Sequence, residues 1–132
     1  MKKLLLLIIG MVLFVSVSAQ IHYYRIYEKD VCRYTDDNVL IGCENSQENC
    51  LFEISGGFKY VTRYFGNEAE YMKCINAFKI SGANAWMLNC YNMVTYSEYD
   101  IIVDYDNSKM FVASKAYTDV AIIFYWSEHW TE

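Results

Sequence analysis

The stretch that decides the fold is residues 99–126, YDIIVDYDNSKMFVASKAYTDVAIIFYW. The polar cluster Asp106–Lys109 separates two runs rich in Ile, Val, Tyr and Phe, a composition typical of a short hairpin connection. Every residue of Val120–Trp126 is apolar or aromatic, which predicts a third strand that is covered on both faces. The stretch therefore predicts three consecutive strands of an antiparallel sheet.

The first two of these strands have a predictable register. Pairing the two ends of the polar cluster sets Val103 opposite Val112 and Asp100 opposite Lys115. Side chains alternate along a strand, so one face becomes apolar and the other charged. The apolar face would carry Tyr99, Ile101, Val103, Tyr105, Met110 and Val112, and the charged face Asp100, Asp104, Asp106, Lys109 and Lys115.

Further strands are expected upstream. Paired glycines at Gly56–Gly57 lie between Leu51–Ser55 and Phe58–Phe65, and glycine accepts the positive φ that tight hairpin turns require. Ala83–Cys90 alternates in the same way and predicts another strand. The chain offers eight candidate strands in all.

One helix is expected between these strands, over Glu68–Ile80. Asn67 can cap it, and Glu70 resembles the partner residue of a capping box. Gly82 follows as a stop. The apolar residues that share one helical stripe are Tyr71, Cys74, Ile75 and Phe78. The predicted fold class is therefore α+β: a mainly antiparallel β sheet with one helix packed on one face, with closure toward a barrel as a variant.

The N-terminus has the three parts of a secretory signal peptide. Lys2–Lys3 precede an apolar run over Leu4–Val15, and the small residues Ser16–Ala19 follow. Cleavage after Ala19 would leave residues 20–132 as a single small, mainly-β domain. The competing interpretation, an uncleaved membrane anchor, needs about 20 apolar residues. The expected localisation is secreted or periplasmic, without stable membrane insertion once the leader is removed.

The charge of the chain limits its partners. The whole sequence has a formal charge of -5, and loss of the two leader lysines lowers the formal charge of the remainder to -7. Nucleic-acid binding needs a basic face that neutralises phosphates. A nucleic-acid partner is therefore not expected.

Five cysteines lie after the predicted cleavage point, where export favours disulfides. They are Cys32, Cys43, Cys50, Cys74 and Cys90. A two-residue turn at Asp37–Asn38 sets Cys32 opposite Cys43, at a separation that a disulfide tolerates. The alternative pairs Cys43 with Cys50 around a polar loop at Glu44–Asn49. No zinc-type cysteine or histidine spacing occurs, so neither a metal nor another cofactor is predicted.

No set of catalytic residues converges in the sequence, and no catalytic residue is assigned. The aromatic residues Tyr125, Trp126 and Trp130 could form a binding surface, for example a platform that stacks on a sugar. The favoured function is a secreted or periplasmic binding or interaction module for a protein or carbohydrate ligand. Two alternatives stay open. One is a small hydrolase that uses His22 or His129 beside a thiol or carboxylate. The other is an inhibitor or immunity-type protein that directs its acidic charge at a basic enzyme cleft.

Overall fold

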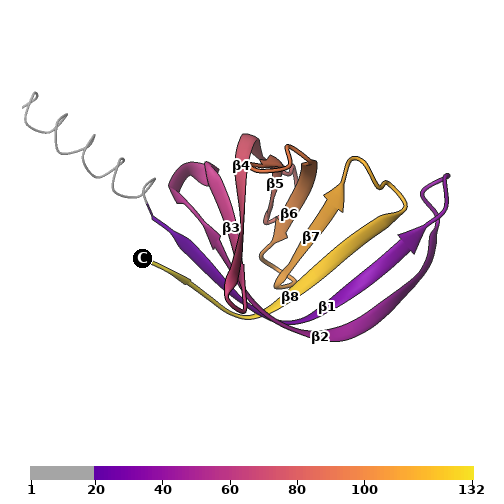
Figure 1. Cartoon of the computed structure of the whole chain (residues 1–132), viewed down its shortest axis with the longest axis horizontal. Helices are drawn as coiled ribbons and strands as arrows, with labels where there is room; N and C mark the ends of the chain where they lie inside the picture. The colour runs from indigo at the N-terminus through magenta and orange to yellow at the C-terminus, as the bar shows by residue number, and fades with distance from the viewer. Residues whose placement is uncertain (1–19) are drawn as a thin grey trace, which may run out of the picture.

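The computed structural model describes residues 20–132, and the predicted leader lies outside the described residues. Eight strands follow one another along the chain (Figure 1). They are β1 (His22–Tyr34), β2 (Leu40–Ile54), β3 (Tyr60–Phe65), β4 (Glu68–Lys79), β5 (Ala85–Asn92), β6 (Glu98–Asp104), β7 (Lys109–Ser114) and β8 (Val120–Thr131). No helix within residues 20–132 has the length and apolar character needed to cross a membrane.

The strands form a closed, antiparallel barrel in which each strand pairs with its neighbours in the sequence. Closure comes from β8, which pairs with β1 from His22 opposite Thr131 to Arg33 opposite Val120. Pairing runs around the whole barrel, although β2 pairs with β3 only over Leu51–Ile54 and β8 pairs with β7 only over Ala121–Tyr125. The predicted α+β class is therefore wrong, although the antiparallel sheet itself is confirmed.

The predicted helix Glu68–Ile80 is instead strand β4, which pairs with β3 on one side and β5 on the other. The one helical segment of residues 20–132 is a short 3-10 turn, Gly56–Phe58. An irregularity between Cys74 and Asn76 shifts the pairing with β5. This bulge breaks the two-residue alternation of β4, so the apolar residues fall at spacings that resemble a helical stripe.

The hairpin of β1 and β2 confirms the predicted pairing of Cys32 with Cys43, which face each other and are disulfide-bonded. The turn differs from the prediction, because the pairing shifts after Arg33 and the residue with positive φ is Asn38. The predicted polar loop Glu44–Asn49 is part of strand β2. The alternative pairing of Cys43 with Cys50 is therefore not present.

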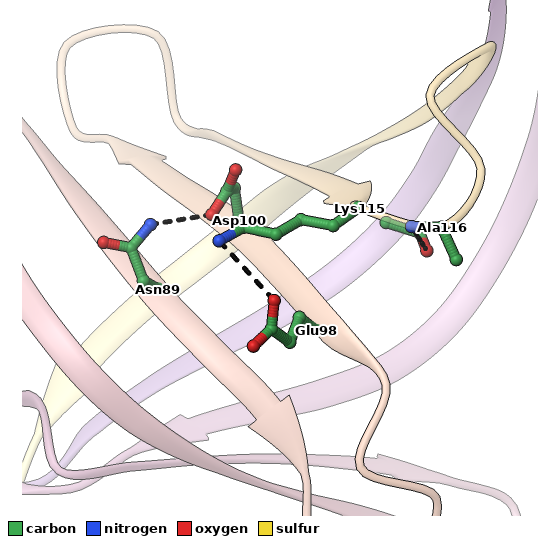
Figure 2. A network of polar contacts seen from close by, with 6 residues as sticks. Asn89, Glu98, Asp100, Lys115 and Ala116 are labelled. Atoms are coloured by element: carbon green, nitrogen blue, oxygen red, sulfur yellow. Dashed lines mark hydrogen bonds and ion pairs between the residues drawn. The ribbon is translucent and has the colours of Figure 1, made fainter.

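The hairpin of β6 and β7 keeps the predicted faces but has a register two residues away from the predicted one. Asp104 pairs with Lys109, and Val103 pairs with Met110. Lys115 Nζ consequently lies 3.7 Å from Glu98 Oε2, and the Asn89 side-chain amide donates to Asp100 Oδ1 at 2.7 Å (Figure 2). A shift of two residues preserves side-chain direction, so the apolar face still points inward.

The core fills the middle of the barrel with side chains from all eight strands. Its buried members are Tyr24, Ile26, Cys50, Phe52, Ile54, Val61, Met72, Leu88, Cys90, Ile101, Val103, Met110, Phe124 and Trp126. Phe52 and Phe124 meet edge to face near its centre, with ring centroids 5.1 Å apart. The centre of the barrel is thus a packed core that separates its two ends.

The two ends carry different residues. The histidine end holds His22 at the start of β1 and His129 near the end of β8. The first and last strands run side by side there (Figure 1). The cavity end holds the end of β1 at Arg33, the end of β7 at Ser114 and the start of β8 at Val120.

Candidate functional site

A cavity of about 470 Å³ opens at the cavity end of the barrel. Its lining combines the apolar side chains of Val112, Val120 and Ile122, the phenols of Tyr99 and Tyr117, and the polar side chains of Arg33, Ser114 and Asp119. Small-molecule sites in proteins have volumes of roughly 300–1,000 Å³ and a mainly apolar lining with a few polar groups. The cavity has the size and the chemistry of such a site.

Strand alternation explains why these side chains meet. Tyr99 and Ser114 face each other across β6 and β7, two residues beyond the buried Ile101 on the same inward face. Val112 faces Ile122 across β7 and β8, and both pack against the core. The cavity is therefore the continuation of the barrel interior beyond its core.

Arg33 supplies the cation of the cavity. It faces Val120 across the closing pair of β1 and β8. The backbone N–H of Tyr34 donates to the carbonyl of Asp119 at 2.8 Å, which fixes the β7–β8 connection beside the end of β1. In the described part of the chain, the ion pairs involve Arg25, Lys29 and Lys115, and none involves Arg33.

Two further basic side chains, Lys29 and Arg63, are partly shielded from solvent. Lys29 Nζ lies 2.8 Å from Glu48 Oε2, with both side chains mostly shielded from solvent. The guanidinium of Arg63 lies over the rings of Phe65 and Phe124, at 4.4 and 5.8 Å from their centroids. Its Nε is buried and has no hydrogen-bond partner within residues 20–132. The charge of Lys29 is thus balanced by Glu48, whereas Arg63 carries a buried donor without a partner in the described residues.

The histidine end is an aromatic cluster. The His22 and His129 rings stack, and Nδ1 of His22 lies 3.0 Å from Nε2 of His129. Burial lowers the pKa of both imidazoles, and the neighbouring His22 lowers the pKa of His129 further. Beneath them the hydroxyls of Tyr24 and Tyr105 share a 2.6 Å hydrogen bond, and burial raises the pKa of both phenols.

The enzyme hypothesis needed a thiol or carboxylate beside one of these histidines. In residues 20–132, the polar side-chain contact of each imidazole is the other imidazole. The aromatic neighbours of the pair are Tyr24, Phe58, Tyr105 and Trp126. Neither imidazole has a thiol or carboxylate as a hydrogen-bond partner within residues 20–132, and such a partner is what the hydrolase hypothesis places beside a histidine.

The three aromatic residues predicted as a binding surface do not lie together. Trp126 points into the barrel and is 7% exposed. Tyr125 lies on the outer face, where its hydroxyl donates to Asp30 Oδ2 at 2.7 Å. Trp130 also lies outside and stacks on Tyr23. A single platform of all three is not formed.

Of the cysteines outside the Cys32–Cys43 disulfide, Cys50 and Cys90 are buried and Cys74 is partly buried. Burial raises the pKa of the Cys50 thiol to about 11. Cys74 and Cys90 face each other across β4 and β5, and their Sγ atoms are 2.9 Å apart. Across the described chain, His, Cys, Asp and Glu side chains form no group of three or more that could hold a metal ion.

The cavity residues were missed by sequence analysis. Val112 and Tyr99 were expected only to fill an apolar face, and the sequence analysis did not single out Arg33. The one usable signal is Arg33 itself, a charged residue on a strand position that alternates with Val31. No protein-family model and no curated protein matches this chain.

Proposed function

We propose that this protein is a secreted or periplasmic binding module that takes a small amphipathic molecule with an acidic group into its cavity end. The observation that carries this proposal is the 470 Å³ cavity, whose apolar wall lies beside the cationic side chain of Arg33. Mouths of β-barrels are common ligand sites, because the sheet supplies a rigid wall and the strand ends supply polar groups.

The chemistry of the lining selects the ligand class. Val112, Val120 and Ile122 would contact a hydrocarbon or aromatic body. Arg33 would pair with a carboxylate or sulfonate, since a guanidinium donates two parallel hydrogen bonds to a planar anion. Asp119 in the lining disfavours a ligand with several negative charges.

The proposed compartment rests on two features. A disulfide between Cys32 and Cys43 is consistent with an oxidising compartment. Residues 1–19 have the composition of a secretory leader. A binding module outside the cytoplasm would meet its ligand directly in the surrounding fluid or periplasm.

The experiment is a fluorescence titration of residues 20–132 with two amphipathic dyes. Anilinonaphthalene sulfonate carries one negative charge, and N-phenylnaphthylamine is a neutral relative with a similar ring system. Ser114→Phe fills the cavity and should abolish binding of both dyes. Arg33→Gln should lower the affinity for the sulfonate dye by about tenfold, because one charge-assisted contact is lost. The affinity for the neutral dye should not change.

Lys73→Gln is the matched control, because it removes one positive charge from an exposed position on the outer face of β4. It should leave both dyes unaffected, and circular dichroism should show the same sheet content in every variant. If Arg33→Gln and Lys73→Gln lowered the affinity for the sulfonate dye equally, the effect would reflect net charge alone, and the proposal would be contradicted. Dye binding that survives Ser114→Phe would place the site elsewhere.

A further inference from the structure

Cys74 and Cys90 face each other inside the barrel wall. They are register partners on β4 and β5, and their Sγ atoms lie 2.9 Å apart. Cys90 is 1% exposed, whereas Cys74 is partly accessible to solvent. Two thiols held this close need no movement of either strand to approach bonding distance.

The backbone hydrogen bonds show which kind of pair these residues form. The N–H of Cys74 donates to the carbonyl of Lys59, on the β3 side of the strand, at 2.8 Å. On the β5 side of the strand, the N–H of Met93 donates to the carbonyl of Tyr71 at 3.0 Å, so the residues of β4 that bond to β5 alternate with Cys74. Cys74 and Cys90 therefore form a non-hydrogen-bonded pair, which brings Cα atoms to about 4.5 Å, inside the range of disulfides.

We propose that Cys74 and Cys90 form a second, exchangeable disulfide that links β4 to β5. The oxidant is itself a disulfide, carried by a thiol–disulfide oxidoreductase or by an oxidised low-molecular-weight thiol. Cys50 is then the remaining free thiol among the five cysteines. The inference goes beyond the proposed function, because it does not depend on any ligand in the cavity.

The reaction follows thiol–disulfide exchange. The thiolate of Cys74 attacks one sulfur of the oxidant, forms a mixed disulfide and releases the other sulfur as a thiolate. Cys90 loses its proton to that thiolate, attacks Sγ of Cys74 and releases the second thiol. The two cysteines together lose two electrons and two protons, and the oxidant is reduced to two thiols.

The accessibility of the two thiols sets this order. Cys74 is the one that an external disulfide can reach, and Cys90 is enclosed behind it. The hydrogen bond from Cys90 also lowers the pKa of Cys74, while the same contact and burial raise the pKa of Cys90. Attack by a partly exposed thiolate and resolution by a buried thiol is the usual division of roles in a dithiol pair.

Tryptic mapping tests the bond directly, because cleavage after Lys73 and Lys79 separates the two cysteines. Residues 20–132 are refolded with oxidised glutathione in excess, alkylated under denaturing conditions and digested without reduction. The expected product is peptide 74–79 joined to peptide 80–109, lighter by two hydrogen atoms than the sum of the free peptides. Alkylation should appear at Cys50.

Cys50→Ser is the matched control, since it removes an interior thiol without touching the pair. It should leave the joined peptides unchanged and abolish alkylation. Peptides 74–79 and 80–109 that are both alkylated, while Cys32 stays joined to peptide 34–59, would overturn the proposal. A link from peptide 34–59 to either of them, lost in Cys50→Ser, would overturn it equally.

A second measurement uses the melting temperature. In Cys32→Ser/Cys43→Ser the first disulfide is absent, so any effect of reductant on the melting temperature must come from another bond. A reducing agent should lower the melting temperature of this variant by several degrees. Adding Cys74→Ser to the variant should remove that shift, and a shift that persists would contradict the assignment.

Discussion

At the scale of single residues, the interior of this barrel is notable for the polar groups that it holds. Arg63 has a buried Nε without a hydrogen-bond partner in residues 20–132, and Lys29 pairs with Glu48 inside the wall. Buried charges cost stability unless they are paired. Lys29 meets this requirement through Glu48, whereas the buried Nε of Arg63 is an unsatisfied donor in residues 20–132.

The two histidines make the stability of the barrel depend on pH. Burial lowers the pKa of His22 and His129 in the folded state. Between the lowered folded pKa and the unfolded value of about 6.5, the unfolded chain binds more protons, so stability falls as pH falls through this window. Above about pH 6.5 both states are neutral at these positions, and the histidines add no pH dependence.

Urea unfolding at a series of pH values measures this effect. The difference in unfolding free energy between the native sequence and His22→Gln/His129→Gln should be constant above about pH 6.5. Below that pH the native sequence should lose stability faster than the variant. Parallel curves, or a native sequence that gains stability on acidification, would contradict the assigned protonation states.

At the scale of elements, strand β4 shows where sequence analysis failed. Asn67, Glu70 and Gly82 match helix-end signals, and the bulge at Cys74 and Asn76 breaks the strand alternation. The helix assignment therefore satisfied the local rules for helix ends. The segment is a strand because it pairs with β3 and β5. This pairing is a tertiary effect that local propensity does not include.

A competing local signal was present at Gly66–Asn67. Phe65 pairs with Glu68 directly across these two residues, and Gly66 has a φ of +61°. Glycine at the first position of a two-residue turn is typical of a type II′ hairpin. By contrast, the alternation of the strands in the β6–β7 and β2–β3 hairpins was predictable. Their turns were not, because Asp104 pairs with Lys109 and Ile54 pairs with Val61, and both connections are longer than two residues.

Gly66→Ala tests this turn. The substitution should lower the unfolding free energy by about 1–2 kcal/mol, because alanine disfavours a positive φ. Steric overlap does not contribute, since no atom lies within 4 Å of the added methyl. Gly42→Ala is the matched control, because it also has free space but no positive φ. It should be neutral or slightly stabilising in urea unfolding. Equal effects of the two substitutions would show that the turn does not need glycine.

At the scale of the whole molecule, the pairing of β8 with β1 brings cavity residues together that are far apart in the sequence. Arg33 and Val120 are distant along the chain, yet they face each other and line one cavity. Only the pairing of the first strand with the last brings them together. The disulfide was predictable because both cysteines belong to one local hairpin, whereas the cavity required the complete barrel.

The hairpin disulfide should contribute strongly to the stability of this closed barrel. Cys32 and Cys43 join β2 to β1, and β1 is the strand that closes the sheet with β8. Cys32→Ser/Cys43→Ser should lower the unfolding free energy by about 3 kcal/mol, the loop-closure value for a short loop. Urea unfolding at constant redox potential measures this difference in unfolding free energy. Cys50→Ser is the control for the loss of a thiol that is not in this disulfide. An unchanged midpoint would mean that strand pairing alone holds the hairpin.

The central claim is that the cavity end of a closed eight-stranded barrel binds an acidic amphipathic molecule. Titration of isotope-labelled residues 20–132 with octanoate, followed by amide chemical shifts, tests it most directly. The account predicts saturable shifts at Tyr99, Ser114 and Val120, with the amides around His22 unmoved. Shifts confined to the histidine end or to the outer face, or no saturable shift at all, would contradict it.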